Sequence, residues 1–205
     1  MRSPLLFRGR NASVFVTLLL VLWFLAAAAL GATGMLGVIP TAFISGSMWA
    51  LLFAALASVW HVHPLYAWME RLHLRAFVLP HASRILGVTV AAVYLPRLLP
   101  HELALSAAAA EVLVGVAALA LCVSGLPIRR DWQWRAMIVW NACGLAGLLT
   151  VIGVAVHTML AHPASVAALS RFPGCLLPTF LLPLLIASHV LLFDRLRKRA
   201  VAYGG

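Results

Sequence analysis

Acidic residues are scarce in this chain, which has 5 Asp and Glu against 15 Lys and Arg among its 205 residues. Charged residues make up only 10% of the chain and hydrophobic residues 64%, and the mean hydropathy is +1.03. A soluble protein of this length cannot bury so much apolar surface, because much of its area faces water. Lipid accepts that surface directly. The composition therefore predicts an integral membrane protein with membrane lipids as partners.

Several motifs of soluble enzymes and redox proteins are also missing. The 3 cysteines include no C-x-x-C pair, so neither a disulfide framework nor a thiol-redox centre is indicated. The sequence contains no Gly-rich phosphate loop, nucleophile elbow or H-E-x-x-H motif. We therefore predict no cofactor. The sequence leaves open whether the protein is an enzyme, and it favours a protein without catalytic activity.

The net charge of +10 raises the question of nucleic acid. A nucleic-acid-binding protein carries its cations on a folded polar face, whereas the Lys and Arg of this chain lie in short segments between apolar runs. We therefore expect no nucleic-acid partner and interpret the charge as a signal of membrane topology.

Six apolar runs are long enough to be candidate spans, since crossing about 30 Å of hydrocarbon takes roughly 20 helical residues. The predicted fold is all-α: one membrane domain over residues 1–205, built as a transmembrane bundle of about six helices. Pro178 and Pro183 fall in the last run, which we keep as one kinked span. The expected spans cover residues 13–30, 41–60, 82–99, 102–123, 136–160 and 175–193.

The orientation follows from the distribution of cations over alternate loops. Arg97 and Arg171 are the only cations in one set of loops. The other thirteen of the 15 Lys and Arg lie in residues 2–10, 71–84, 129–135 and 195–199. Because cytoplasmic loops carry the excess of positive charge, both termini are predicted to be cytoplasmic. The segment 61–81, which mixes aromatics with Arg and His, is expected to lie in the headgroup region as a short amphipathic helix on that side.

Glu111 is the strongest intramembrane candidate. It lies about eight residues into its span, roughly 12 Å deep at helical rise. A carboxyl at that depth is expected to be neutral unless a cation or a water pocket faces it. Glu111 could bind or relay a proton or coordinate a polar substrate group; alternatively, it is a protonated carboxyl bonded to a neighbouring helix. The Ala-rich run before it, with Gly115 after it, is expected to let another helix approach closely.

Asn141 and His189 lie at similar depths in the fifth and sixth spans and are expected to meet. A polar site that extends from this pair to Arg84, with Thr179 as further lining, would face the cytoplasm. The plain alternatives are an interhelical hydrogen bond that fixes packing and, for Arg84, a charge that snorkels to the interface.

The 8 histidines require a test for metal and haem. His61 and His63 form an H-x-H beside a proline without a carboxylate or cysteine partner, which is a weak metal signal, and we predict no metal. Haem would need axial histidines at matched depth. His157 and His189 lie near opposite ends of their spans, so they do not form such a pair.

Four short motifs and one histidine of this chain are similar to those of a known family. Arg84-Ile-Leu-Gly, Glu111-Val-Leu-Val-Gly, Trp140-Asn-x-x-Gly and Leu177-Pro-Thr, followed by His189, together resemble a family of small uncharacterised bacterial multi-pass membrane proteins over roughly the C-terminal two thirds. The resemblance implies a bacterial inner-membrane location and an acidic residue at the Glu111 position. It also implies a second Asp after the Trp-Asn-x-x-Gly motif, where this chain has Gly147. No activity comes with it.

Three functions remain open. The first is a small carrier or channel-like component for a proton, an ion or a small solute. The second is an accessory or assembly subunit, with other membrane subunits or further copies of this chain as partners. The third is a membrane enzyme that acts on a lipid, quinone or isoprenoid, with Glu111 or His189 as acid or base.

Overall fold

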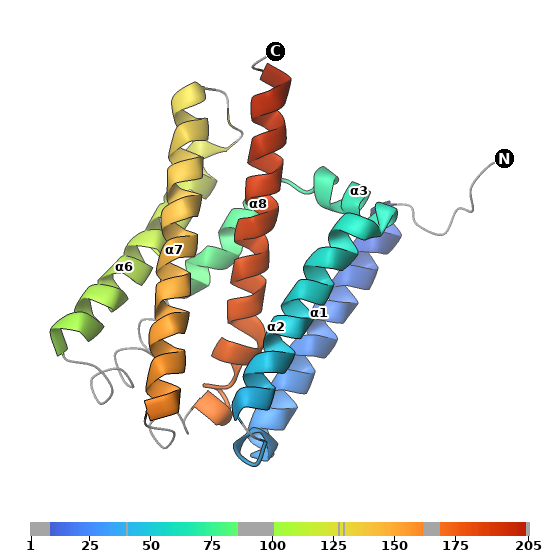
Figure 1. The fold of residues 1–205 in the computed structure, drawn as a ribbon. Coiled ribbons are helices and arrows are strands. Elements are labelled where there is room, and N and C mark those ends of the chain that lie inside the picture. The colour runs from blue at the N-terminus through green and yellow to red at the C-terminus, as the bar shows by residue number, and fades with distance from the viewer. Residues whose placement is uncertain are drawn as a thin grey trace. The chain divides into compact units, whose positions relative to one another are not determined.

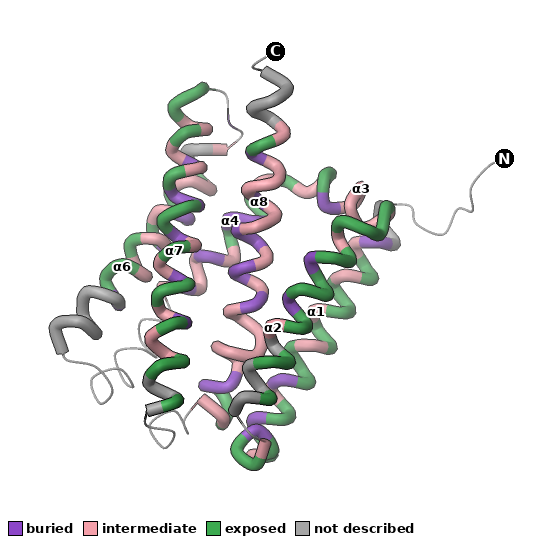
Figure 2. The backbone as a smooth tube through the Cα atoms, viewed as in Figure 1, coloured by how far each residue is buried: buried purple, intermediate pink, exposed green. Residues whose placement is uncertain are grey.

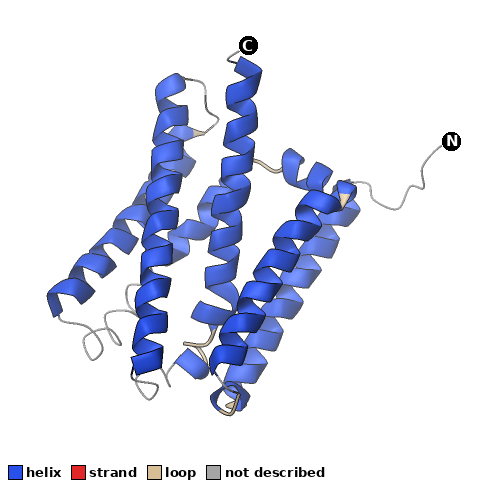
Figure 3. Ribbon diagram, in the orientation of Figure 1, coloured by secondary structure: helices blue, strands red, loops and turns tan. Residues whose placement is uncertain are grey.

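A computed structural model describes residues 9–39, 41–85, 101–126, 128, 130–161 and 169–203. All regular elements in these ranges are helices, and none is a strand (Figure 3). The predicted all-α class is therefore confirmed. The chain divides into two compact units. Unit 1 comprises Met1–Leu72 and Leu169–Pro183, and unit 2 comprises His73–Ala168 and Leu184–Gly205.

Unit 1 is built around two long apolar helices joined by a short turn (Figure 1). Gly34 makes this turn with a φ of 72°, a left-handed conformation that costs glycine little. The third helix and the segment η7 each contact both long helices. The elements are α1 (Gly9–Ala32), η2 (Met35–Gly37), α2 (Thr41–His61), α3 (His63–Arg71) and η7 (Leu177–Leu181).

Most of α1 is exposed, as Figure 2 shows. Leu22, for example, is 63% exposed. The contacts that α1 does make in unit 1 are aromatic and polar. Trp23 and Phe24 pack edge-on against Phe180 of η7, with ring centroids 5.6 and 5.5 Å apart. The indole of Trp68 in α3 donates to Ser13 at 2.8 Å.

Unit 2 contains α4 (Arg75–Val78), η3 (Leu79–Ser83), α6 (His101–Ala120), η5 (Leu121–Gly125), α7 (Asp131–Ala161) and most of α8 (Leu182–Tyr203). Helix α6 packs against η3 and α7. Gly115 makes the first contact possible: a Cβ there would lie 2.7 Å from Ile85 Cγ1 and 3.3 Å from the His81 carbonyl. The close approach expected at Gly115 is confirmed.

Three helices in the described part of the chain are long and apolar enough to cross a membrane: Ala12–Ala32, Asp131–His157 and Leu177–Lys198. A fourth is obtained if Trp49–His61 and His63–Arg71, bent by 89°, count as one span. The described residues thus contain three candidate spans, or four with the bent pair, and the six-span arrangement stays a prediction. The expected third span, 82–99, lies mostly outside the described residues, and the fourth contains a shorter apolar helix, Ala108–Val123.

Two boundaries differ from the sequence-based expectation. Helix α7 begins at Asp131 rather than at 136, because an acidic first turn is stabilised by the positive end of the helix dipole. Helix α8 continues through the basic residues 195–199. The segment 61–81 contains α3, α4 and η3, so the helix expected there is present in pieces. Pro64 suits the first turn of α3, where its missing N–H costs nothing.

Candidate functional site

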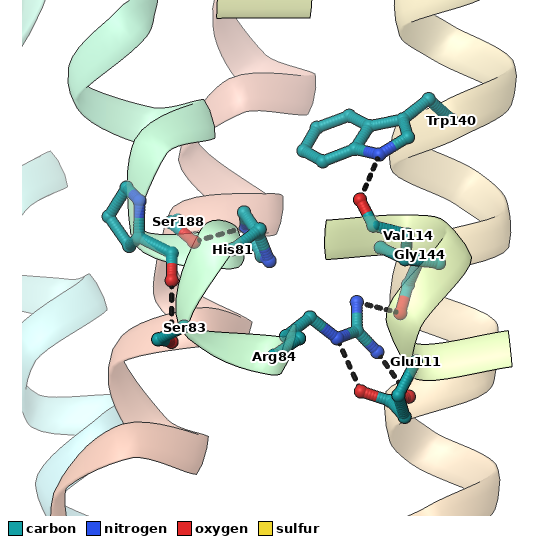
Figure 4. Close-up of polar contacts among 9 residues, drawn as sticks. His81, Ser83, Arg84, Glu111, Val114, Trp140, Gly144 and Ser188 are labelled. Carbon is teal, nitrogen blue, oxygen red and sulfur yellow. Dashed lines mark hydrogen bonds and ion pairs between the residues drawn. The ribbon is translucent and has the colours of Figure 1, made fainter. Parts of the chain in front are cut away.

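The site is centred on an ion pair in unit 2. Arg84 follows η3, and its side chain is 1% exposed; Glu111 lies midway along α6, and its side chain is 19% exposed. The guanidinium donates through Nε to Glu111 Oε2 at 2.5 Å and through Nη2 to Oε1 at 2.6 Å (Figure 4). Such a two-point contact is among the strongest side-chain pairings. A cation therefore faces Glu111 directly.

Arg84 also reaches a third element. Its Nη1 donates to the carbonyl of Gly144 on α7 at 3.0 Å (Figure 4). The residue as a whole is 3% exposed. The alternative that Arg84 snorkels to the interface is therefore wrong: its charge is buried and cancelled by Glu111 on α6.

Asn141 and His189 meet, as expected. The amide Nδ2 of Asn141 on α7 donates to the His189 carbonyl on α8 at 3.0 Å, and the ring Nδ1 of His189 lies 2.7 Å from Asn141 Oδ1. Both residues are fully buried. The pair links α7 to α8 one helical turn from Gly144.

A second histidine lies beside this pair. His81 of η3 is fully buried, and its Nε2 lies 2.8 Å from the hydroxyl of Ser188 on α8. The His81 and His189 rings are 4.0 Å apart between centroids. Trp140 packs against both rings, at 5.2 and 5.8 Å, and its indole donates to the Val114 carbonyl (Figure 4).

The ion pair and the histidines form one cluster because Gly144 has no side chain. A Cβ at Gly144 would lie 2.7 Å from Cε1 and 3.2 Å from Nε2 of His189, and 3.3 Å from Arg84 Nη1. Gly147, one turn further on, faces the ion pair itself. A Cβ there would lie 3.8 Å from Glu111 Oε1 and 3.9 Å from Arg84 Nη2. The position at which the resemblance implies an Asp is therefore adjacent to the ion pair.

The remaining predicted residues lie elsewhere. Thr179 belongs to unit 1, where its hydroxyl donates to the Cys175 carbonyl of its own helical segment at 2.6 Å. His61 and His63 are exposed on either side of the bend between α2 and α3. No group of three or more potential metal ligands occurs within the described residues.

The sequence does not reveal that His81, Ser188 and Gly144 belong to this cluster. The position of His81 ahead of the third apolar run assigns it to the cytoplasmic loop, and Ser188 and Gly144 carry little signal by themselves. The motif Trp140-Asn-x-x-Gly holds a usable clue, since residues 140, 141 and 144 lie close together on a helix.

In comparisons with known proteins, this chain matches a protein family. The family described as a domain of unknown function (DUF8737) matches residues 41–197, which include every residue of the cluster. No curated protein and no solved structure matches the chain.

Proposed function

This chain belongs to the family described as a domain of unknown function (DUF8737), and from the site in unit 2 we propose that it acts as a small carrier or channel-like component. Its cargo is a proton, an ion or a small solute. The cargo binds within the membrane at one site, the cluster of Arg84, Glu111, Asn141, His81 and His189.

The proposed setting is the inner membrane of a bacterium, with six spans and both termini in the cytoplasm. Thirteen of the 15 Lys and Arg fall in alternate segments, which supports this orientation. The three long apolar helices, and the bent α2 and α3, supply spans on this topology.

The observation that carries the proposal is a pair of unmatched nitrogens. His81 Nδ1 and His189 Nε2 are buried and have no hydrogen-bond partner within the described part of the chain. Buried polar atoms without partners are costly, so these two nitrogens favour a partner from outside the chain. Two such atoms beside a compensated ion pair support a binding site at this cluster.

The test is flux in reconstituted vesicles. Proton flux is followed with an internal pH dye, and ion flux with a membrane-potential dye. The double variant R84M/E111L removes the ion pair without leaving a lone buried charge, so it is expected to fold. We expect flux through the parent protein and its loss in the double variant.

Two results would overturn the proposal: unchanged flux in a folded double variant, or no proton or ion flux through the parent. Copurification of stoichiometric subunits from native membranes together with absent flux would favour the accessory-subunit function instead.

A further inference from the structure

The charged side chains of α7 and α8 all lie at one end of these two helices. Residues 136–161 of α7 and 182–193 of α8 contain no Asp, Glu, Lys or Arg. The charges lie at the start of α7 and toward the end of α8, and these two ends are side by side at the top of Figure 1. Both helices are long and apolar enough to cross a membrane. Charges at the end of a spanning helix lie at the depth of the lipid headgroups.

A hydrogen bond joins the two charged ends. The indole of Trp134 on α7 donates to the Leu196 carbonyl on α8 at 3.3 Å. Arg135 follows Trp134 in the chain, and Arg197 follows Leu196. Both arginines are exposed, the side chain of Arg197 by 80%. The bond therefore brings one exposed cation of each helix to the same region.

Helix α4 joins the same end of unit 2. Arg75 is its first residue and is exposed, and its Nη2 donates to the Leu126 carbonyl ahead of α7 at 3.4 Å. The guanidinium of Arg195 on α8 lies over the ring of Phe77 on α4, 6.0 Å from the ring centroid. Three elements of unit 2 thus hold cations at one surface.

This surface has a large excess of positive charge. Residue 75 and the stretches 129–135 and 194–199 contain eight Lys and Arg against two Asp, a net charge of +6. Asp194 lies 3.7 Å from Arg197 and 2.9 Å from Lys198, so one acid is shared by two cations. Such an excess attracts anions. The exposed and half-exposed cations form what we call the basic surface: Arg75, Arg130, Arg135, Arg197 and Lys198.

Trp132 indicates which anions meet the basic surface. It is 60% exposed and lies in the chain between the exposed Arg130 and Arg135. Tryptophan is enriched at membrane–water interfaces, where its amphipathic ring sits among the headgroups. Lipid phosphates are present at that depth beside the helix ends, whereas a nucleic acid or an acidic protein would have to approach through the headgroup layer. The location therefore favours lipid.

We propose that the basic surface binds the phosphate groups of anionic phospholipids and so anchors this end of α4, α7 and α8. Guanidinium groups suit this ligand, because their planar N–H donors match two phosphate oxygens at once. The lipid surface is separate from the buried cluster around Arg84. It goes beyond the carrier function and does not depend on it.

The experiment counts lipids bound to the purified full chain. The delipidated protein in a neutral detergent is titrated with phosphatidylglycerol or with phosphatidylcholine, and native mass spectrometry resolves each bound lipid. Phosphatidylglycerol should bind more tightly, and its binding should weaken as salt is added, because salt screens exposed charges. Arg135→Gln and Arg197→Gln should each weaken it by about fivefold, the order of effect of one cation near an anionic surface.

Arg171→Gln is the matched control. It also removes one exposed arginine, but from unit 1. It should bind phosphatidylglycerol like the parent. All three substitutions are at exposed positions, and thermal melting in detergent checks that each variant folds.

The outcomes decide the proposal without reference to transport. Equal affinity for the two lipids overturns it, as does parental affinity in folded Arg135→Gln and Arg197→Gln. An equal loss in Arg171→Gln would assign the binding to net charge alone and also overturns it. Competition by free glycerol phosphate at the concentration of the lipid would show a site for soluble anions instead. Lipid binding as expected with no flux overturns the carrier function and leaves the lipid surface standing.

Discussion

At the scale of single residues, Arg84 decides how the polar groups of unit 2 are arranged. Its guanidinium bonds Glu111 on α6 and the Gly144 carbonyl on α7 while its own backbone follows η3. A buried charge is tolerated only when it is paired and its N–H groups have acceptors. Arg84 meets both conditions. The arrangement of Glu111 and Gly144 around it therefore depends on these bonds.

Glu111→Gln should destabilise the protein by about 3–5 kcal/mol, because it leaves the Arg84 charge buried without compensation. The double variant R84M/E111L should lie much closer to the parent, since it removes both charges. Thermal unfolding in detergent measures both. A Glu111→Gln variant as stable as the parent would contradict the ion pair as the main charge balance of this unit.

Gly147→Asp should place a second carboxylate on the same guanidinium. The substitution fits sterically, because a Cβ there is in ordinary contact with Glu111 Oε1 at 3.8 Å and Arg84 Nη2 at 3.9 Å. Two carboxylates beside one cation repel, so one of them should hold a proton near neutral pH. Infrared spectroscopy should show a protonated carboxyl band that Gly147→Asn lacks; its absence from a folded Gly147→Asp protein would contradict this geometry.

At the scale of elements, unit 2 depends on close approach between α6 and η3. Gly115 lies against Ile85 and the His81 carbonyl, so this contact positions both the histidine and, one residue before Ile85, Arg84. The same helix α6 carries Glu111. The geometry of the cluster is therefore set by how closely these two elements pack.

Gly115→Ala should destabilise the protein by about 1–3 kcal/mol, because the added methyl would lie 2.7 Å from Ile85 Cγ1 and 3.2 Å from the Ile85 backbone nitrogen. Gly153→Ala on α7 meets nothing within 4 Å, and its higher helix propensity should leave stability unchanged or slightly raised. Melting temperatures in detergent test both. Equal melting temperatures for the two variants would show that α6 does not pack on η3 through Gly115.

At the scale of the whole molecule, the distribution of cations makes the proposed topology testable. Cysteine introduced at exposed Arg171 should react with a membrane-impermeant maleimide in intact cells, whereas cysteine at Arg130 should react only after lysis. The parent protein, which has cysteines at positions 122, 143 and 175, serves as the background control. Labelling of both sites from the same side would contradict alternate placement of these loops.

The sequence by itself determines the features of this protein that depend on position along the chain. Long apolar runs require helices in lipid, since backbone groups there must be satisfied within the segment. Depth follows from 1.5 Å per residue, and this rise alone puts Asn141 and His189 at the same level. Their hydrogen bonds confirm that expectation.

Only the tertiary structure decides which side chains at nearby levels face one another. Glu111 and the Asn141–His189 pair are expected at different depths. The long side chain of Arg84 connects them, because it bonds both Glu111 and the carbonyl of Gly144, and His189 packs against Gly144. His81 enters the cluster because η3 packs against α6. Rotation about a helix axis and the packing of neighbours determine these contacts, and a nearly uniformly apolar sequence shows little of either, because lipid and helix interface accept the same residues.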